Sequence, residues 1–427
     1  MCAATTRTRP SCSTWPRFGP CVSSPRPDWC LTFGIVRPAK LPPPDASSAE
    51  YTEAILEYAR SLGLDRVGVT HAGILDRARV ALVDRRERGL SDTMGFTFRD
   101  PIRSTDPDRA VTGAQSIVVA ALSYAIDDSG DDSGDDTDGA GDGGGRPALS
   151  ARVARYARHD FYTPLRQSLQ QVALRLRHDG FRAVVFADEN DLVDREVAWR
   201  AGLGWWGKNA NLLVPGAGSW FVLGSLVTTA PLRATAQPAP DGCGSCQRCF
   251  DDCPTGAIVD AGVIDARRCL AWLVQKPGIF PREFRIALGD RLYGCDDCQE
   301  SCPPTVRLGR RVPARIGSGG PGAHVDVIEV LTADDAHLLD RFGRWYLAER
   351  DPRWLRRNAL VILGNIASTP VDEPVLGVLR HYLSHRDPML RAHAVWAARR
   401  LGRADLVTGL ADDPDPDVRA ELDEVGT

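Results

Sequence analysis

The chain has 427 residues, of which 43% are hydrophobic and 25% charged, the composition of an ordinary folded globular protein. This composition excludes a fibrous, collagen-like or wholly disordered chain, and the length suggests about three domains. The formal net charge is −4, so no overall basic field points to nucleic acid. No apolar run is long enough to span a membrane and the N-terminus lacks a secretory signal, so we expect a cytoplasmic protein.

Residues 1–48 are rich in Pro, Ser and Arg and show no periodic pattern of hydrophobic residues. We interpret this segment as a disordered extension, or as the product of a start codon placed too early. Four of the twelve cysteines lie in it at irregular spacing, which does not describe a metal site.

Residues 49–235 alternate between helical and strand patterns, which predicts an α/β domain of layered helices over a sheet. An acidic, glycine-rich stretch at 127–145 interrupts the pattern, and we expect a solvated loop there. The predicted helices and strands cover residues 51–62, 66–70, 116–124, 164–179, 181–187 and 191–201, followed by a strand pair at 211–214 and 220–229.

A glycine-rich stretch, Gly202-Leu-Gly-Trp-Trp-Gly207-Lys208-Asn209, matches a dinucleotide-binding pattern and nearly matches a phosphate-binding loop. Both interpretations fail on context, because a predicted helix precedes the glycines and a predicted strand follows them. Asn209 also stands where a phosphate-binding loop needs a hydroxyl for magnesium. The two Trp side chains favour a bulky planar ligand instead.

Eight cysteines lie in residues 236–312, in two runs. The first run, Cys243-x2-Cys246-x2-Cys249-x3-Cys253-Pro, has the spacing of bacterial ferredoxins, which bind 4Fe–4S clusters. The second has Cys269, a 25-residue spacer, and then Cys295-x2-Cys298-x3-Cys302-Pro. Zinc sites and buried free thiols are the alternatives, but zinc prefers paired CxxC knuckles.

In two-cluster ferredoxins the last cysteine of each run ligates the other cluster. This rule predicts two ligand sets, which we call the first and second cluster sites. The first cluster site contains Cys243, Cys246, Cys249 and Cys302, and the second contains Cys253, Cys269, Cys295 and Cys298. Two adjacent clusters form a path for electrons, which implies a redox centre or a partner at its end.

Residues 313–427 repeat an Asp-Pro, Arg and Leu-Gly pattern typical of stacked helix pairs similar to HEAT repeats. The whole chain is therefore predicted to be an α+β multidomain protein. It combines the α/β domain, a ferredoxin-like two-cluster module and C-terminal HEAT-like α-helical repeats. Helical repeats of this kind commonly present a binding surface, so we expect the C-terminal part to contact a partner.

Several stretches together resemble the epoxyqueuosine reductase family. They cover roughly residues 50–310 and are Tyr156-Ala-Arg-x-Asp160, Arg200-Ala-Gly-Leu-Gly-Trp-x-Gly-Lys-Asn209, Cys269-Leu-Ala-Trp-Leu and Arg291-Leu-Tyr-Gly-Cys-Asp-x-Cys298. His159 and Tyr162 depart from the family pattern. The resemblance implies reduction of epoxyqueuosine to queuosine at the wobble position of a tRNA. It also implies two 4Fe–4S clusters and base-off cobalamin, which makes the α/β domain corrinoid-binding.

The resemblance places the family's catalytic acid at Asp188, with Asp194 as a second candidate. Glu189 and Asp191 depart from the family pattern, and we expect these neighbouring acids to help raise the pKa of Asp188. From the residues alone, a turn or cap role is the favoured interpretation of Asp188, and the resemblance is what favours catalysis. Expected cofactor contacts are Arg103, Asp160, Trp205, Lys208 and Asn209.

Basic residues near and beyond the second cysteine run are candidates for contacts with tRNA phosphates, although exposed Arg residues are commonly only solvated. Residues 303–403 carry a net charge of +6, and residues 404–427 one of −7. The candidates are Lys276, Arg307, Arg310 and Arg311, with Arg353, Arg356 and Arg357 at the start of one repeat helix. We expect a monomer that takes electrons from a donor protein or another reductant.

Two other functions remain open at this point. One is a corrinoid reductive dehalogenase, although such enzymes usually carry an export signal and lack HEAT-like repeats. The other is a non-enzymatic two-cluster electron carrier, which would need no corrin.

Overall fold

The computed structural model describes residues 45–126, 149–314 and 320–423. Most of the predicted extension (1–48) and all of the predicted acidic loop (127–145) lie outside the described residues. In the described ranges, no helix combines the length and the apolar character needed to cross a membrane.

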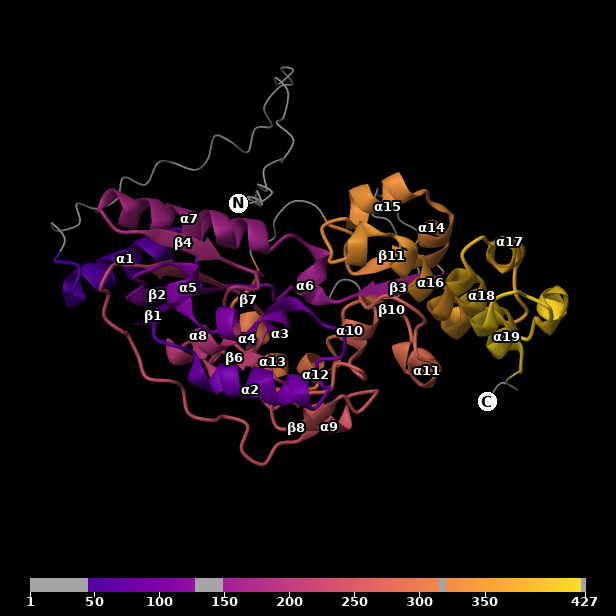
Figure 1. Cartoon of the computed structure of the whole chain (residues 1–427), viewed down its shortest axis with the longest axis horizontal. Helices are drawn as coiled ribbons and strands as arrows, with labels where there is room; N and C mark the ends of the chain where they lie inside the picture. Colours follow the sequence, from indigo (N-terminus) through magenta and orange to yellow (C-terminus); the bar gives the residue numbers. More distant parts are fainter. Residues whose placement is uncertain (1–44, 127–148, 315–319, 424–427) are drawn as a thin grey trace, which may run out of the picture. The chain divides into compact units, whose positions relative to one another are not determined.

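A four-stranded antiparallel sheet forms the centre of the N-terminal half, in the order β1-β2-β7-β4 (Figure 1). Its strands are β1 (Arg66–His71), β2 (Ser116–Ser123), β4 (Ala183–Phe186) and β7 (Phe221–Thr228). The two central strands are buried along their whole length, which explains their nearly continuous apolar sequences. Val118 of β2 lies opposite Val69 of β1 and Leu226 of β7, which sets the register.

Helices cover both faces of this sheet, so the expected layers are present, but without parallel βαβ units. Helices α1 (Ala49–Ser61) and α7 (Tyr162–His178) pack on one face, and α8 (Asp194–Arg200) packs on the other (Figure 1). Ala198 of α8 shares a hydrophobic core with Ile117 and Val119 of β2. The other helices of this half are α2 (Asp76–Glu87), α3 (Phe96–Arg99), α4 (Pro101–Ser104), α5 (Pro107–Ala110) and α6 (Arg155–Arg158).

The predicted pairing of residues 211–214 with 220–229 is wrong. Strand β6 (Leu212–Leu213) pairs with β5 (Trp205–Trp206), whereas β7 lies between β2 and β4 in the large sheet. A tight turn, bridged only between Val214 and Gly218, separates the two segments. The long apolar run of β7 has two sheet neighbours already, so it offers no free edge to β6.

The cysteine-rich module is built from short elements and turns. They are α9 (Arg248–Asp251), β8 (Ile258–Asp260), β9 (Val263–Ile264), α10 (Leu270–Leu273), η2 (Arg282–Phe284), α11 (Arg285–Leu288), β10 (Arg291–Tyr293), α12 (Asp297–Glu300), α13 (Pro303–Leu308) and η3 (Gly309–Arg311). Strand β10 belongs to a second sheet, in which β3 (Ser150–Val153) lies between β10 and β11 (His324–Asp326). This small sheet joins segments from all three predicted domains.

Helices dominate the C-terminal part. They are α14 (Val327–Thr332), α15 (Asp335–Phe342), η4 (Ala348–Arg350), α16 (Arg353–Ile366), α17 (Glu373–Leu383), α18 (Pro388–Arg400), η5 (Ala404–Leu410) and α19 (Pro416–Asp423). The three Asp-Pro pairs of the sequence pattern lie directly at the starts of α16, α18 and α19. At α18 the Asp387 side chain accepts a hydrogen bond from the Met389 backbone N–H, which caps the helix.

Candidate functional site

The cysteines of the two runs converge in the described structure. Cys243, Cys246 and Cys249 of the first run line one cavity together with Cys302 of the second run. The cavity has a volume of about 450 Å³ and also contacts Pro303 and Leu308. Its four thiols are those expected to hold the first cluster.

Electrostatic effects between the thiols show which cysteines are neighbours. Burial, together with the thiols of Cys302, Cys243 and Cys246, raises the pKa of Cys249 to about 11. The pKa of Cys298 is raised by burial first, and then by the nearby charges of Cys269, Asp296 and Cys253. These neighbours follow the two predicted sets.

Cys249 also raises the pKa of Cys298, so the two groups of thiols adjoin. Cys295 lies in a separate small cavity beside Asp297, whose carboxylate accepts a hydrogen bond from the Cys295 thiol at 2.9 Å. Arg291 donates to the same Asp297 side chain at 2.7 Å and holds it in place.

The glycine-rich loop has a structural explanation that involves no phosphate. As expected, α8 precedes it and a strand, β6, follows it; the short strand β5 lies within it. A Cβ atom at Gly204 would lie 2.3 Å from the Leu213 carbonyl oxygen, and one at Gly207 would lie 2.3 Å from the Leu213 side chain. Glycine is therefore needed at both positions because β6 passes so close.

Two residues after these glycines hold the cysteine module. Lys208 Nζ donates to the carbonyl oxygens of Gly244 and Cys246, at 2.7 and 2.9 Å. Buried Asn209 donates from Nδ2 to the Cys298 carbonyl oxygen at 2.9 Å. Adjacent residues thus fasten one loop of each cysteine run. The Trp205 ring packs against Gly242, one residue before the first run.

The predicted acid, Asp188, lies in an exposed loop after β4, with a left-handed backbone (φ 56°). The loop is tied down on both sides: Arg166 donates to the Ala187 carbonyl oxygen, and the Ser104 hydroxyl donates to that of Asn190. Surrounding protein raises the pKa of Asp188, and Arg166 opposes the shift. An aspartate tolerates this conformation better than most residues, and such strained positions are frequent at functional sites.

The second candidate, Asp194, lies next to Asp188 at the start of α8. Its carboxylate accepts hydrogen bonds from the Asp188 backbone N–H and, at 3.5 Å, from the Ser225 hydroxyl. Burial, followed by the negative charge of Asp188, raises the pKa of Asp194 to about 8. This carboxyl therefore keeps its proton near neutral pH.

The expected contribution of Glu189 and Asp191 to the pKa of Asp188 is wrong, because burial is what raises it. Asp191 instead forms an ion pair with Arg103 at 2.5 Å, and the Arg103 side chain is 64% exposed. The repulsion between like charges that changes a pKa here is the one between Asp188 and Asp194, and it raises the pKa of Asp194.

The sequence analysis missed three residues around these aspartates. Arg195, exposed on α8, lowers the pKa of Asp194 and also that of Cys269 in the second cluster set. Burial, followed by the negative charges of Asp188 and Asp194, raises the pKa of Tyr162. The third residue is Tyr124, whose own pKa is affected by both Tyr162 and Arg195. Arg195 directly follows Asp194, so proximity to a candidate acid was the available signal.

Asp160 and His159 lie two and three residues before Tyr162. Asp160 accepts hydrogen bonds from the Thr163 backbone N–H and hydroxyl, at 3.0 and 2.6 Å, as a helix-capping residue does. Among the described residues, the buried Nδ1 of His159 has no hydrogen-bond partner. Burial also lowers the pKa of His159, so its imidazole is neutral.

The predicted tRNA contacts have different environments. Arg307 and Arg311 are exposed, and Arg307 lines the cavity of the first thiol group. The described structure does not extend to the side chain of Arg310. Lys276 forms an ion pair with Asp92 at 2.7 Å and is 29% exposed.

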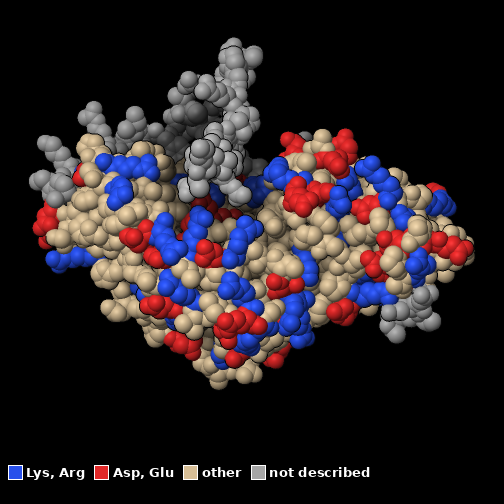
Figure 2. Space-filling model, viewed as in Figure 1, with Lys and Arg blue, Asp and Glu red and all other residues tan. Residues whose placement is uncertain are grey.

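The expectation that Arg357 faces a phosphate is wrong, because this residue is only 1% exposed. Arg353 and Arg356 are paired with Asp351 and Asp335. Figure 2 shows Lys and Arg side chains interspersed with Asp and Glu over the visible face. Over the described residues, this face therefore has no single continuous basic patch (Figure 2).

Comparisons with known proteins follow the same organisation. A family profile described as a 4Fe-4S double cluster binding domain matches residues 242–305, and one described as HEAT repeats matches residues 344–424. The epoxyqueuosine reductase of Bacillus subtilis is 30% identical over 384 residues, which cover 87% of this chain and 94% of that protein.

Two solved structures are similar over most of their length. A crystal structure of epoxyqueuosine reductase with an epoxyqueuosine-modified tRNA-Tyr stem loop has a TM-score of 0.75 and 28% identity, covering 87% of this chain and 96% of that one. A Bacillus subtilis epoxyqueuosine reductase has a TM-score of 0.74, 29% identity and the same coverage. In that structure the catalytic aspartate loop is swung out of the active site.

Proposed function

The chain belongs to the epoxyqueuosine reductase family, and we propose that it reduces epoxyqueuosine to queuosine at the wobble position of a tRNA. In this reaction the epoxide oxygen leaves as water, with the uptake of two electrons and two protons. One observation carries the proposal: the thiols of Cys243, Cys246 and Cys249 line one cavity together with Cys302, which comes from the other cysteine run.

The cysteine module supplies the binding sites for two 4Fe–4S clusters in this proposal. Cys243, Cys246, Cys249 and Cys302 hold the first cluster, and Cys253, Cys269, Cys295 and Cys298 hold the second. The shared cavity of the first four thiols supports this assignment. The effect of Cys249 on the pKa of Cys298 supports a short path for electrons between the clusters.

Base-off cobalamin is the cofactor that the family implies beside the aspartates. The unpartnered Nδ1 of His159 fits a ligand with amide groups at its edge, as a corrin has. His159 and Asp160, with Arg103 of helix α4, would hold the corrin. Bound cobalamin would supply a low-potential metal centre for reducing the epoxide.

The two aspartates divide the proton chemistry. Asp188 presents its carboxyl from an exposed loop, where it can donate a proton to the leaving oxygen. Asp194 lies below it and remains protonated up to a pH of about 8. Since Asp194 accepts the Asp188 N–H, it also holds the loop in its left-handed conformation. The catalytic aspartate loop of the Bacillus subtilis structure supports this role for the loop.

The substrate in this proposal is the anticodon stem loop of a tRNA bearing epoxyqueuosine. Arg307 and Arg311 are exposed and suit phosphate contacts, with Arg310 between them in the chain. Lys276 would have to exchange its Asp92 partner for a phosphate. The proposal takes the protein to be a cytoplasmic monomer that receives electrons from a separate donor.

The test is an anaerobic reconstitution with iron, sulfide and cobalamin, followed by incubation with a chemical reductant and an epoxyqueuosine-bearing stem loop. Nucleoside analysis that finds queuosine supports the proposal. Unchanged epoxyqueuosine, with both clusters and the corrin spectrum present, would reject it. Iron–sulfide content without any corrin binding would favour the electron carrier instead.

A further inference from the structure

The spacer between Cys269 and Cys295, residues 270–294, is an unusual insertion within a cysteine run. It contains helix α10, helix α11 and strand β10. Its apolar residues, including Leu273, Phe280 and Leu292, belong to the same hydrophobic core as Leu355 and Leu360 of α16. The spacer is therefore packed by the C-terminal repeats, although it separates two members of one cysteine run.

Arg357 of α16 is the centre of the polar contacts between the repeats and the spacer. Its guanidinium donates to the carbonyl oxygens of Leu273, Val274 and Gly278, at 2.8, 3.2 and 2.9 Å, and also to that of Lys276. Among the described residues, it donates to these backbone carbonyls and to the side-chain oxygen of Asn358. This fully buried cation thus holds the chain that begins four residues after Cys269.

Asn358 extends the same contact to the other end of the spacer. Its Nδ2 donates to Val274 and to Leu292, at 2.9 and 3.2 Å. Leu292 lies in β10, three residues before Cys295. One turn of a repeat helix therefore joins the segment after Cys269 to the segment before Cys295.

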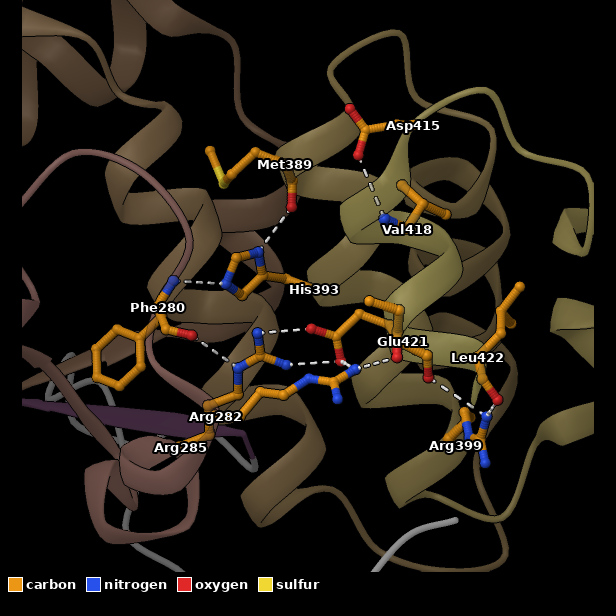
Figure 3. A network of polar contacts seen from close by, with 11 residues as sticks. Phe280, Arg282, Arg285, Met389, His393, Arg399, Asp415, Val418, Glu421 and Leu422 are labelled. Atoms are coloured by element: carbon orange, nitrogen blue, oxygen red, sulfur yellow. Dashed lines mark hydrogen bonds and ion pairs between the residues drawn. The ribbon is translucent and has the colours of Figure 1, made fainter. Parts of the chain in front are cut away.

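The middle of the spacer is held by later repeat helices (Figure 3). Buried Arg285 forms a two-point ion pair with Glu421 of α19, at 3.0 and 2.8 Å. His393 of α18 accepts a hydrogen bond from the Phe280 backbone N–H at 3.1 Å and contacts the Met389 carbonyl oxygen through Nδ1 at 2.7 Å. Asn365 of α16 donates to the carbonyl oxygens of Arg285 and Gly289.

We propose that the C-terminal repeats position the ligands of the second cluster site, with Arg357 as the principal positioning residue. Cys269 and Cys295 lie at the two ends of the segment that α16, α18 and α19 hold. The N-terminal domain also holds one loop of each site, through Lys208 at Gly244 and Cys246 and through Asn209 at Cys298, so the repeats add a second support to the second site. The inference rests on the iron–sulfur part of the proposed function.

The experiment compares Arg357→Lys with wild-type full-length chain after anaerobic reconstitution. Lysine keeps the positive charge but cannot reach several carbonyl oxygens at once. We expect half of the bound iron, about four of about eight ions per chain, to be lost or to be released to a chelator on the order of tenfold faster. Electron paramagnetic resonance should show the loss of the interaction between the two reduced clusters.

Two further variants make the result specific. Asn365→Ala is a milder change, because Asn365 is partly exposed and contacts only the middle of the spacer; it should accelerate release of the same half of the iron to a smaller extent. Arg391→Gln is the matched control, because in the described part of the chain Arg391 pairs with Asp413 inside the repeats and not with the spacer. It should leave iron release at the wild-type rate.

Wild-type iron release in both Arg357→Lys and Asn365→Ala would overturn the inference while leaving the proposed function intact. Equal acceleration in Arg391→Gln would also overturn it, since the effect would then be a general loosening of the repeats. A wild-type chain that binds no iron and sulfide at all would instead reject the proposed function.

Discussion

The two cysteine runs reach their sites by different routes. The first places three thiols within seven residues, in turns such as the Cys246 N–H to Cys243 carbonyl hydrogen bond of 3.0 Å. The second spreads its members across a spacer whose apolar residues lie in the core of the repeats. Local spacing is therefore enough to form most of the first site, whereas the second depends on residues that follow it by up to about 130 positions.

The largest effects, and the sharpest difference between the two cluster sites, are expected from substitutions of the last cysteine of each run. Cys302→Ser should empty the first cluster site although Cys302 belongs to the second run, and Cys253→Ser should empty the second. Each variant should retain about four irons and lose all measurable turnover, because one half of the electron path is missing. Mössbauer or paramagnetic resonance spectra of the two variants would show different remaining clusters. Identical spectra would contradict the crossed assignment.

Substitution of the aspartates should change turnover without changing cluster binding at either cysteine run. Asp188→Asn removes the proton donor, so we expect turnover to fall about a hundredfold to ten-thousandfold. Both clusters should remain, as shown by unchanged iron and sulfide content. Activity of the unaltered chain should decline as pH rises through about 8, where Asp194 loses its proton. Full activity of Asp188→Asn would place the acid elsewhere.

The buried ion pair that holds the spacer should carry more stability than any surface pair. Glu421→Gln leaves the fully buried Arg285 guanidinium without its counter-charge, which should lower the free energy of unfolding by about 3–5 kcal/mol. Denaturant unfolding followed by tryptophan fluorescence measures this change. The control is Glu373→Gln, whose partner Arg380 is 52% exposed, with an expected change below about 1 kcal/mol. Equal effects would show that the spacer contact is no more than a surface pair.

The smallest expected effect is a pH dependence of the same contact. Burial, followed by Arg285, lowers the pKa of His393 far below 6.5, so the folded protein holds this imidazole neutral. Its contribution to stability is complete above the unfolded pKa of about 6.5 and is lost as pH falls below it. The loss approaches about 1.4 kcal/mol per pH unit. His393→Gln should remove this slope in urea titrations between pH 5 and about 7, and an unchanged slope would assign it to another group.

Much of the fold could be predicted from local patterns. The apolar runs of β2 and β7, and the Asp-Pro starts of α16, α18 and α19, lie where the sequence places them. The partner of β6 was not predictable, because strand length and hydrophobicity do not specify which edge a strand joins. The helix before the glycine-rich loop and the strand after it could be predicted, but the role of this loop in holding both cysteine loops depended on the positions of Gly244 and Cys298.

The candidate site shows the same limit. Asp188 and Asp194 were both identified from their place in the chain, but their ranking by charge environment was not available. Glu189 and Asp191 are closer in sequence to Asp188. The carboxyl whose pKa Asp188 raises is nevertheless that of Asp194, because α8 places this side chain beside the loop. Arg357 illustrates the opposite case, since an Arg in a polar helix start is normally solvated and here is buried.

Residue types and short spacings are enough to specify the chemical groups of the chain: eight thiols at ferredoxin spacing, an acidic loop after a buried strand, and a helical repeat. These properties depend on residue type and on separations of a few residues, which backbone geometry converts directly into distance. Tertiary structure decided which thiols share a cavity, which carboxyl keeps its proton and which helices hold the spacer. Those outcomes depend on burial and on contacts between distant segments, and only the packed chain defines them.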